Sequence, residues 1–552
     1  MAIRITRCSN DYGASRGAIA SPCNAAMRRC PVSESPAIVY NGLLLRRSGT
    51  RFEYPEDLPM SLAPSEVRVI VIGAMLALFL SALDQTIVAT ALPPIAKELG
   101  DFVLISWVVT AYLLTSTCAT PIVGKLSDLY GRRVILRVCL VVLVAGSVLC
   151  ALAPNMLALI AARALQGIGG GGLITMSQTI IADVVSPRER GRYSGYFSIV
   201  WGGSSVLGPT LGGILTQEYG WPWIFWINIP LGLIALLVSD RALRKLPVEH
   251  HRSRVDYLGI ALLCGATILL LLVLSLGGER LPWTAPGTLA LAAAVFFLIA
   301  LFSWQQGRSR EPILPPNFLA DSVIRPVLAA IFIVFGSYLA IAVLAPIYFQ
   351  VALGAPVSEA GLLMIPLMLS STLTANLAGQ HSRRSGRYKR PPLVGLPVSI
   401  AALGIVAFLA DRLSTIEASV ILTIAGFGIG PIFPCSIVAA QNAVERRQLG
   451  VVSGVIAFSR ALGGAIAVAA ASALVLGLAA AALTHSGQIS SLEDLAQQTL
   501  PPEARAAVAR AFGVMFGCVA AALAVGLAVF ARVEDRPLGE RPAMATAPVA
   551  DP

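Results

Sequence analysis

The chain has 552 residues, of which 56% are apolar and only 13% are charged, and its net charge is +11. Soluble globular chains carry roughly 25% charged residues, and disordered chains combine low hydrophobicity with high charge, so both classes are excluded. In a soluble protein the positive charge would suggest a nucleic-acid partner. Here it indicates basic loops that orient the chain in a lipid bilayer, and we expect no nucleic acid.

Residues 1–66 are rich in Arg and Ser and contain no long apolar run. A secretory signal needs an apolar core of about 7–15 residues, so we predict a basic, disordered cytoplasmic tail instead. Met60 stands just before the first apolar stretch, and we leave open whether residues 1–59 belong to the mature protein.

Apolar stretches follow in regular order, and since each span takes about 20 residues, they predict about fourteen spans. The first six lie near residues 68–92, 103–123, 134–153, 157–182, 193–216 and 222–240. A central pair lies near residues 257–277 and 286–304. The last six lie near residues 326–350, 357–378, 392–410, 417–441, 450–476 and 511–531. An even number of spans places both termini on one side of the membrane.

Basic residues gather in every second connection between these spans. The basic set lies within residues 125–137, 188–192, 241–254, 308–325, 383–390, 446–447 and 532–541. The opposite connections hold only Lys97, Arg280, Arg412, Arg505 and Arg510. The positive-inside rule places the first set and both termini in the cytoplasm. We therefore expect a multi-pass protein of the cell (inner) membrane.

The chain also repeats itself. A shift of 259 residues pairs Gly167 with Gly426, Gly191 with Gly450, and Gly195 with Gly454, and a shift of 255 pairs Gly124 with Gly379. The first shift moves span four to span twelve, so two helices are inserted between two six-helix halves. We predict an all-α polytopic protein with a six-helix bundle at 67–240, a linker with two additional helices at 241–310, a second six-helix bundle at 311–532, and a cytoplasmic tail at 533–552. Parallel halves around a central path form a transporter architecture.

The connection between spans two and three reads GKLSDLYGRR, from Gly124 to Arg133. Glycines permit tight turns, and Asp128 can face a helix N-terminus or an arginine. This pattern resembles the loop signature of the major facilitator superfamily. The resemblance implies that family's fold and a conformational latch formed by Gly124, Asp128, Gly131, Arg132 and Arg133. The second copy, from Gly379, has Arg383 in place of Asp128, so we expect a degenerate latch there.

Two ionisable residues stand inside apolar spans. Asp84 is the only carboxylate well within a span, and no histidine lies in one, so Asp84 is the leading candidate for a reversible proton site. The Leu-Asp-x-Thr pattern around Asp84 resembles the first-span motif of fourteen-span drug:proton antiporters, the EmrB/QacA type. Arg163 in span four is costly to bury and marks a functional path. The matching family motif implies that Arg163 takes part in proton coupling.

Span five reads WGGSSVLGPTLGG, from Trp201 to Gly213. Glycine and proline here loosen the helix and allow close approach of a neighbour. The segment resembles the motif that distinguishes exporters of the superfamily, which implies an antiporter motif at Gly203, Gly208, Pro209, Gly212 and Gly213.

Aromatic and amide side chains mark a candidate substrate cavity: Gln85, Tyr112, Gln178, Trp201, Tyr338, Gln350 and Asn376. Span ten has no deep acid, and span thirteen has Arg460 but no acid. This absence favours monovalent cationic, neutral or anionic amphipaths over divalent cationic drugs.

The sequence therefore predicts a proton-coupled exporter of amphipathic drugs that works by alternating access. It contains no nucleotide-binding phosphate loop, metal-ligand spacing or nucleophile constellation, so we expect neither an enzyme nor a cofactor nor a metal. Two alternatives stay open: an exporter with narrow specificity for a metabolite, lipid or siderophore, and a non-transporting membrane sensor. A periplasmic adaptor is a further open partner; otherwise we expect a monomer.

Overall fold

The computed structural model describes residues 37–40, 43–48, 51–53, 64–100, 104–245, 255–276, 285–309, 311–482 and 502–538. The chain divides into two compact units, Met1–Leu62 and Ala63–Pro552.

The first unit contains an antiparallel sheet of strands β1 (Ala37–Tyr40), β2 (Leu43–Ser48) and β3 (Arg51–Glu53), in that order. In its register Ala37 pairs with Arg46, and Arg47 pairs with Phe52. β-Branched and aromatic residues in the first strand favour this geometry. The sheet lies within the segment for which the sequence predicts disorder, and the other residues of that segment up to 63 are outside the described ones.

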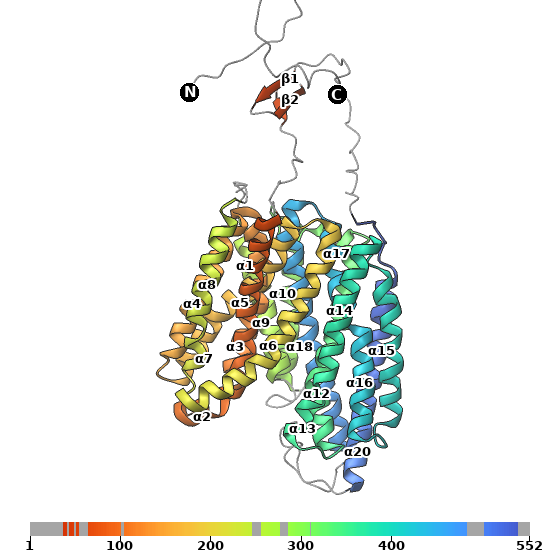
Figure 1. Cartoon of the computed structure of the whole chain (residues 1–552). Coiled ribbons are helices and arrows are strands. Elements are labelled where there is room, and N and C mark those ends of the chain that lie inside the picture. The colour runs from red at the N-terminus through yellow and green to blue at the C-terminus, as the bar shows by residue number, and fades with distance from the viewer. Residues whose placement is uncertain are drawn as a thin grey trace, which may run out of the picture. The chain divides into compact units, whose positions relative to one another are not determined.

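The second unit begins with the helices of the N-terminal half. They are α1 (Pro64–Ile87), a 3-10 turn (Val88–Ala91), α2 (Leu92–Leu99), α3 (Ile105–Tyr130), α4 (Arg132–Ala151), α5 (Met156–Val184), α6 (Pro187–Tyr219), α7 (Trp223–Trp226) and α8 (Asn228–Ala242). Helix α5 packs against α1, α3 and α4, while α8 packs against α1 and α4. These contacts join the helices into one bundle (Figure 1).

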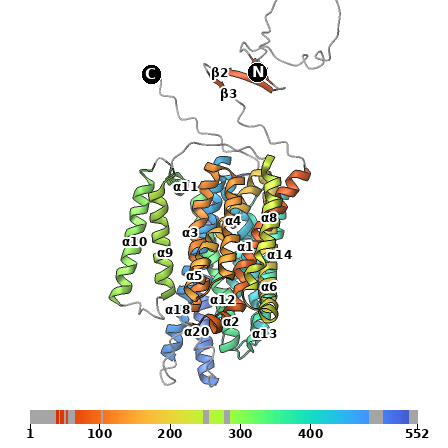
Figure 2. The same ribbon diagram turned by 90° about the vertical axis from the view of Figure 1, so that its left-hand side faces the viewer.

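Two helices, α9 (Tyr257–Leu276) and α10 (Pro286–Gln306), follow and pack against each other. Figure 2 shows this pair beside the other helices, and α9 touches α3 and α18. Helix α9 thus contacts one helix before it in the chain, α3, and one after it, α18.

The C-terminal half repeats the bundle. Its elements are α11 (Pro316–Ala320), α12 (Ile324–Val351), α13 (Val357–Leu362), α14 (Ile365–Ser385), α15 (Arg390–Leu409), α16 (Thr415–Ile429), α17 (Ile432–Asn442), a 3-10 turn (Arg446–Gln448), α18 (Leu449–Ala482) and α20 (Pro502–Ala531). Helix α12 packs against α18 and α20, and α15 packs against α16 and α20. Buried apolar side chains such as Leu344, Leu403 and Phe516 fill the core of this half.

Thirteen helices in the described part of the chain are long and apolar enough to cross a membrane. Helix α6 is not among them because its glycines and serines lower its mean hydropathy, although it is 33 residues long. It packs against α1 in one half and against α14 in the other. Counting α6, the described residues form the fourteen spans that the sequence predicts.

The two halves meet along two lines of contact. In the first seam α3 packs against α18, and in the second seam α6 packs against α14. A Cβ on Gly124 would collide with the carbonyl oxygen of Gly450, and a Cβ on Gly191 would lie 2.7 Å from the carbonyl oxygen of Gly379. Small residues of this kind let helix backbones approach closely. We call the end of the bundle that holds these crossings the latch end.

Candidate functional site: a buried ion pair and two seams

Asp84 and Arg163 meet inside the N-terminal half. Arg163 Nη1 on α5 donates a hydrogen bond of 2.9 Å to Asp84 Oδ2 on α1. The two side chains are only 1% and 0% exposed. A buried charge must be compensated to be stable, and here each residue compensates the other. The two ionisable residues that stand out in the sequence therefore form one site.

Three further polar side chains complete this site. Asp84 Oδ1 accepts hydrogen bonds of 2.6 Å from Gln166 Nε2 and of 2.6 Å from Asn228 Nδ2. Both amides also donate to Ser147 Oγ, at 2.7 and 3.2 Å. Sequence reasoning missed all three. Gln166 follows Arg163 by one helical turn on the same face, which was an available signal, whereas Asn228 and Ser147 meet the pair only through packing.

Arg163 is held on its other sides as well. Its Nη1 also donates to Gln166 Oε1 at 2.7 Å, and its Nε donates to the carbonyl oxygen of Val108 at 3.2 Å. The guanidinium lies 4.3 Å from the centre of the Tyr112 ring. Tyr112, which the sequence predicts as a cavity residue, is 1% exposed and belongs to this buried network instead. Among the described residues, Asp84 is the carboxylate that pairs with Arg163.

Asp128 joins the two halves at the first seam. Its Oδ1 accepts a hydrogen bond of 3.0 Å from the Gly450 amide, and its Oδ2 accepts one of 2.8 Å from the Val451 amide. These amides start α18, where helical N–H groups lack partners within the helix, and the helix dipole favours a negative charge there. Asp128 is 6% exposed. A carboxylate of one half thus caps a helix of the other.

Basic residues surround this cap. Arg132 pairs with Asp128, and its Nε lies 2.6 Å from Asp183 Oδ2 at the end of α5. Arg446 of the other half lies 3.7 Å from the same carboxylate. Gly131, between α3 and α4, has φ +88°, a conformation that favours glycine. These contacts hold the latch end of α3 against both α5 and the C-terminal half.

Arg133 has a different role from Arg132. It contacts Asp240 of α8 at 3.0 Å, and Arg137 pairs with the same carboxylate. All three residues belong to the N-terminal half, so this part of the predicted latch fastens α4 to α8 rather than one half to the other.

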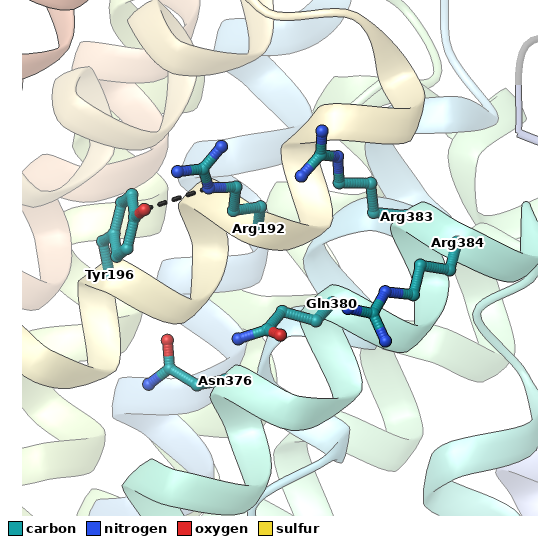
Figure 3. A pocket seen from close by; sticks show the side chains of 6 residues that line it. All are labelled: Arg192, Tyr196, Asn376, Gln380, Arg383 and Arg384. Atoms are coloured by element: carbon teal, nitrogen blue, oxygen red, sulfur yellow. Dashed lines mark hydrogen bonds between the residues drawn. The ribbon is translucent and has the colours of Figure 1, made fainter.

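The second seam contains a pocket of about 320 Å³ at the latch end. Figure 3 shows the six side chains that line it: Arg192 and Tyr196 from α6, and Asn376, Gln380, Arg383 and Arg384 from α14. Arg383 also lies 3.3 Å from Glu189 of α6, and both side chains are exposed. Asn376, predicted as a cavity residue, lines this pocket.

The glycines of the predicted antiporter motif lie in two different surroundings. A Cβ on Gly208 would collide with Thr86 of α1, and one on Gly212 would collide with Thr90, whereas Gly203 and Gly213 have no neighbour within 4 Å of such an atom. Thr86 Oγ1 donates a hydrogen bond of 2.9 Å to the carbonyl oxygen of Ser204. Pro209 lies inside α6. The motif thus packs directly on the segment of α1 that follows Asp84.

The other predicted cavity residues lie apart from this network. Tyr338 Oη lies 3.4 Å from Ser371 Oγ. The side-chain oxygen of Gln178 is buried without a hydrogen-bond partner among the described residues. Gln85, Trp201 and Gln350 are half-buried. Within the described residues no group of three or more His, Cys, Asp or Glu could hold a metal.

Comparison with known proteins gives this arrangement a family. The family profile of the Major Facilitator Superfamily matches residues 74–468. Multidrug transporter protein MdtP of Bacillus subtilis is 35% identical over 401 residues, which cover 72% of this chain and 74% of that protein. Efflux pump dotC of Dothistroma septosporum is 34% identical over 416 residues, which cover 74% of this chain and 72% of that protein.

Solved structures share the fold. The human organic anion transporter MFSD10 (TETRAN) matches with a TM-score of 0.59 at 16% sequence identity, over 85% of this chain and 100% of that one. The chain therefore belongs to the Major Facilitator Superfamily and to its drug-efflux branch.

Proposed function

We propose that this protein is a proton-coupled antiporter that exports small amphipathic molecules by alternating access. The observation that carries the proposal is the buried pair of Asp84 and Arg163, whose charges are balanced only while Asp84 is ionised. Ionisable groups within membrane helices mark proton relays and substrate paths. The printed names of the relatives, a multidrug transporter and an efflux pump, support export.

In this mechanism a proton from outside binds the Asp84 carboxylate and neutralises it. Arg163 then loses the negative charge with which it is paired. We expect α1, which carries Asp84, to move relative to α5, which carries Arg163. Because Gly208 and Gly212 of α6 pack on α1 just after Asp84, such a movement reaches the helix that forms the second seam. Release of the proton on the other side restores the pair and completes the cycle.

The conformation described here is the one closed at the latch end. We place that end in the cytoplasm, with both termini, because its connections carry most of the basic residues. Opening towards the cytoplasm then requires Asp128 to leave the start of α18. The proposal needs a cell membrane, a proton gradient and one copy of the chain, without an adaptor protein.

Replacing Asp84 tests the proposal. Asp84→Asn keeps a side chain of the same shape that still hydrogen-bonds but cannot titrate. We expect efflux of a dye panel from cells to fall at least tenfold, to the level that a protonophore produces in cells with the wild-type protein, at equal membrane abundance. Glu218→Gln, which changes an exposed carboxylate near the end of α6, is the matched control and retains efflux.

Efflux by Asp84→Asn equal to the wild type would refute proton coupling through this residue. Wild-type accumulation that does not change across the dye panel, with or without the protonophore, would favour a narrow-specificity exporter or a non-transporting sensor.

A further inference from the structure

A second arginine lies deep in the membrane part of the C-terminal half. Arg460 stands eleven residues after Leu449, the first residue of α18. At 1.5 Å per residue this distance is about 16 Å, near the middle of a hydrocarbon core about 30 Å thick. In a bilayer, such a charge normally faces a bundle interior or a water-filled cavity rather than lipid.

Unlike Arg163, Arg460 has no counter-ion among the described residues. Its Nε is buried without a hydrogen-bond partner, and no ion pair involves it within the described residues. Arg163, by contrast, has a carboxylate, an amide and a backbone carbonyl as partners. An uncompensated guanidinium in a medium of low dielectric constant attracts an anion strongly.

Aromatic rings surround the free guanidinium. Its central carbon lies 4.5 Å from the centre of the Phe335 ring on α12 and 6.0 Å from that of Phe433 on α17. Tyr338 packs edge-to-face on Phe433 with 5.5 Å between ring centres. We call these four residues, Arg460, Phe335, Phe433 and Tyr338, the Arg460 cluster. All four are half-buried, so part of each side chain is accessible.

The internal repeat gives the cluster an equivalent place in the other half. The shift of 259 residues that pairs Gly195 with Gly454 also pairs Trp201 with Arg460. Trp201 lies on α6 and Arg460 on α18, the two helices that each reach across a seam to the other half. Trp201 follows Gly191, and Arg460 follows Gly450, by the same distance of nearly three helical turns. Trp201 and Arg460 therefore occupy equivalent positions on the two helices.

We propose that the Arg460 cluster binds the anionic group of a transported amphipath, a carboxylate or sulfonate, with the aromatic body of that molecule against Phe335, Phe433 and Tyr338. Guanidinium groups bind carboxylates through two parallel hydrogen bonds, and aromatic rings supply the apolar contact that orients a ligand. The inference rests on the proposed export function and narrows its substrate class to anions.

A pair of dyes with one ring system and opposite charge tests the inference. Fluorescein is anionic, and rhodamine 123, whose carboxyl group is a methyl ester, is cationic. Binding is measured by fluorescence anisotropy with purified protein, and transport is measured in proteoliposomes with an imposed pH gradient. We expect the wild type to bind fluorescein more tightly than rhodamine 123. Arg460→Gln should weaken fluorescein binding at least tenfold without weakening rhodamine 123 binding, and Arg460→Lys should retain part of the preference.

Equal losses for both dyes in a folded, monodisperse Arg460→Gln protein would assign Arg460 a structural role and overturn the proposal. A wild type that binds neither dye, or prefers rhodamine 123, overturns it as well. Failure of the proposed function looks different, because binding would keep its charge preference while the pH gradient drove no transport.

Discussion

The two seams between the halves are equivalent by the internal repeat, yet they are closed by different chemistry. At the first seam the buried Asp128 of α3 caps the start of α18 through two backbone hydrogen bonds. At the second seam Arg383 of α14 occupies the equivalent position and pairs with Glu189 of α6, with side chains 46% and 40% exposed. Each seam contains its own pair of glycines in close contact, Gly124 with Gly450 at the first and Gly191 with Gly379 at the second.

This difference separates packing from electrostatics. The glycine pairs let the helices approach closely at both seams. A buried carboxylate, Asp128, joins the halves at the first seam, whereas the ion pair at the second seam is exposed. Exposed ion pairs contribute about 0–1 kcal/mol, whereas removal of one partner from a buried pair costs about 3–5 kcal/mol. We therefore expect the first seam to hold the latch end closed. The second seam should open and close with the first without adding much stability of its own.

Removal of the first cap should have the largest effect. Asp128→Ala leaves the Gly450 and Val451 amides without partners and Arg132 without one of its two carboxylates. We expect the conformation open at the latch end to gain about 3 kcal/mol relative to the closed one. Spin labels at Tyr130 and Glu445 would report a longer distance in the variant. An unchanged distance distribution would contradict the role of this cap.

Added methyl groups at the crossings compare the seams by packing alone. Gly124→Ala meets the carbonyl oxygen of Gly450 more closely than Gly191→Ala meets that of Gly379. Overpacking costs about 1–3 kcal/mol, so both variants should open the latch end, Gly124→Ala more than Gly191→Ala. The same pair of labels measures both. The reverse order would mean that the second seam is the tighter one.

Loss of the exposed pair should have the smallest effect. Glu189→Gln removes the partner of Arg383, and we expect a shift below about 1 kcal/mol that disappears at high salt. Transport rates at low and high ionic strength would measure it, with Arg384→Gln as a control for loss of one charge in the same region. A loss comparable to that in Asp128→Ala would show that the second seam is a latch of equal strength.

Much of this fold was predictable because membrane helices carry few ionisable groups. The fourteen spans, the resemblance to the major facilitator superfamily and the drug-efflux branch are confirmed. Asp84 and Arg163 stand out in the sequence because each is a lone charge in an apolar stretch.

The rest of the site could not be predicted, because it depends on which side chains the fold packs together. Amides and hydroxyls such as Asn228 and Ser147 are common in helices, and only the fold brings them to Asp84. Tyr112 looks like a cavity residue for the same reason, since an aromatic side chain stacks equally well on a substrate or on a buried guanidinium. Likewise, the sequence shows that Arg460 lies in an apolar helix, but only the fold shows that its Nε is buried without a hydrogen-bond partner among the described residues.

The most direct test of the account is coupled transport by the purified protein. Proteoliposomes with an imposed pH gradient would be loaded with dye at equal concentration on both sides, so that only coupling can concentrate it. We predict that the wild type builds a dye gradient that collapses with a protonophore, and that Asp84→Asn exchanges dye without building any gradient. A gradient of wild-type size in Asp84→Asn would contradict proton coupling through the buried pair.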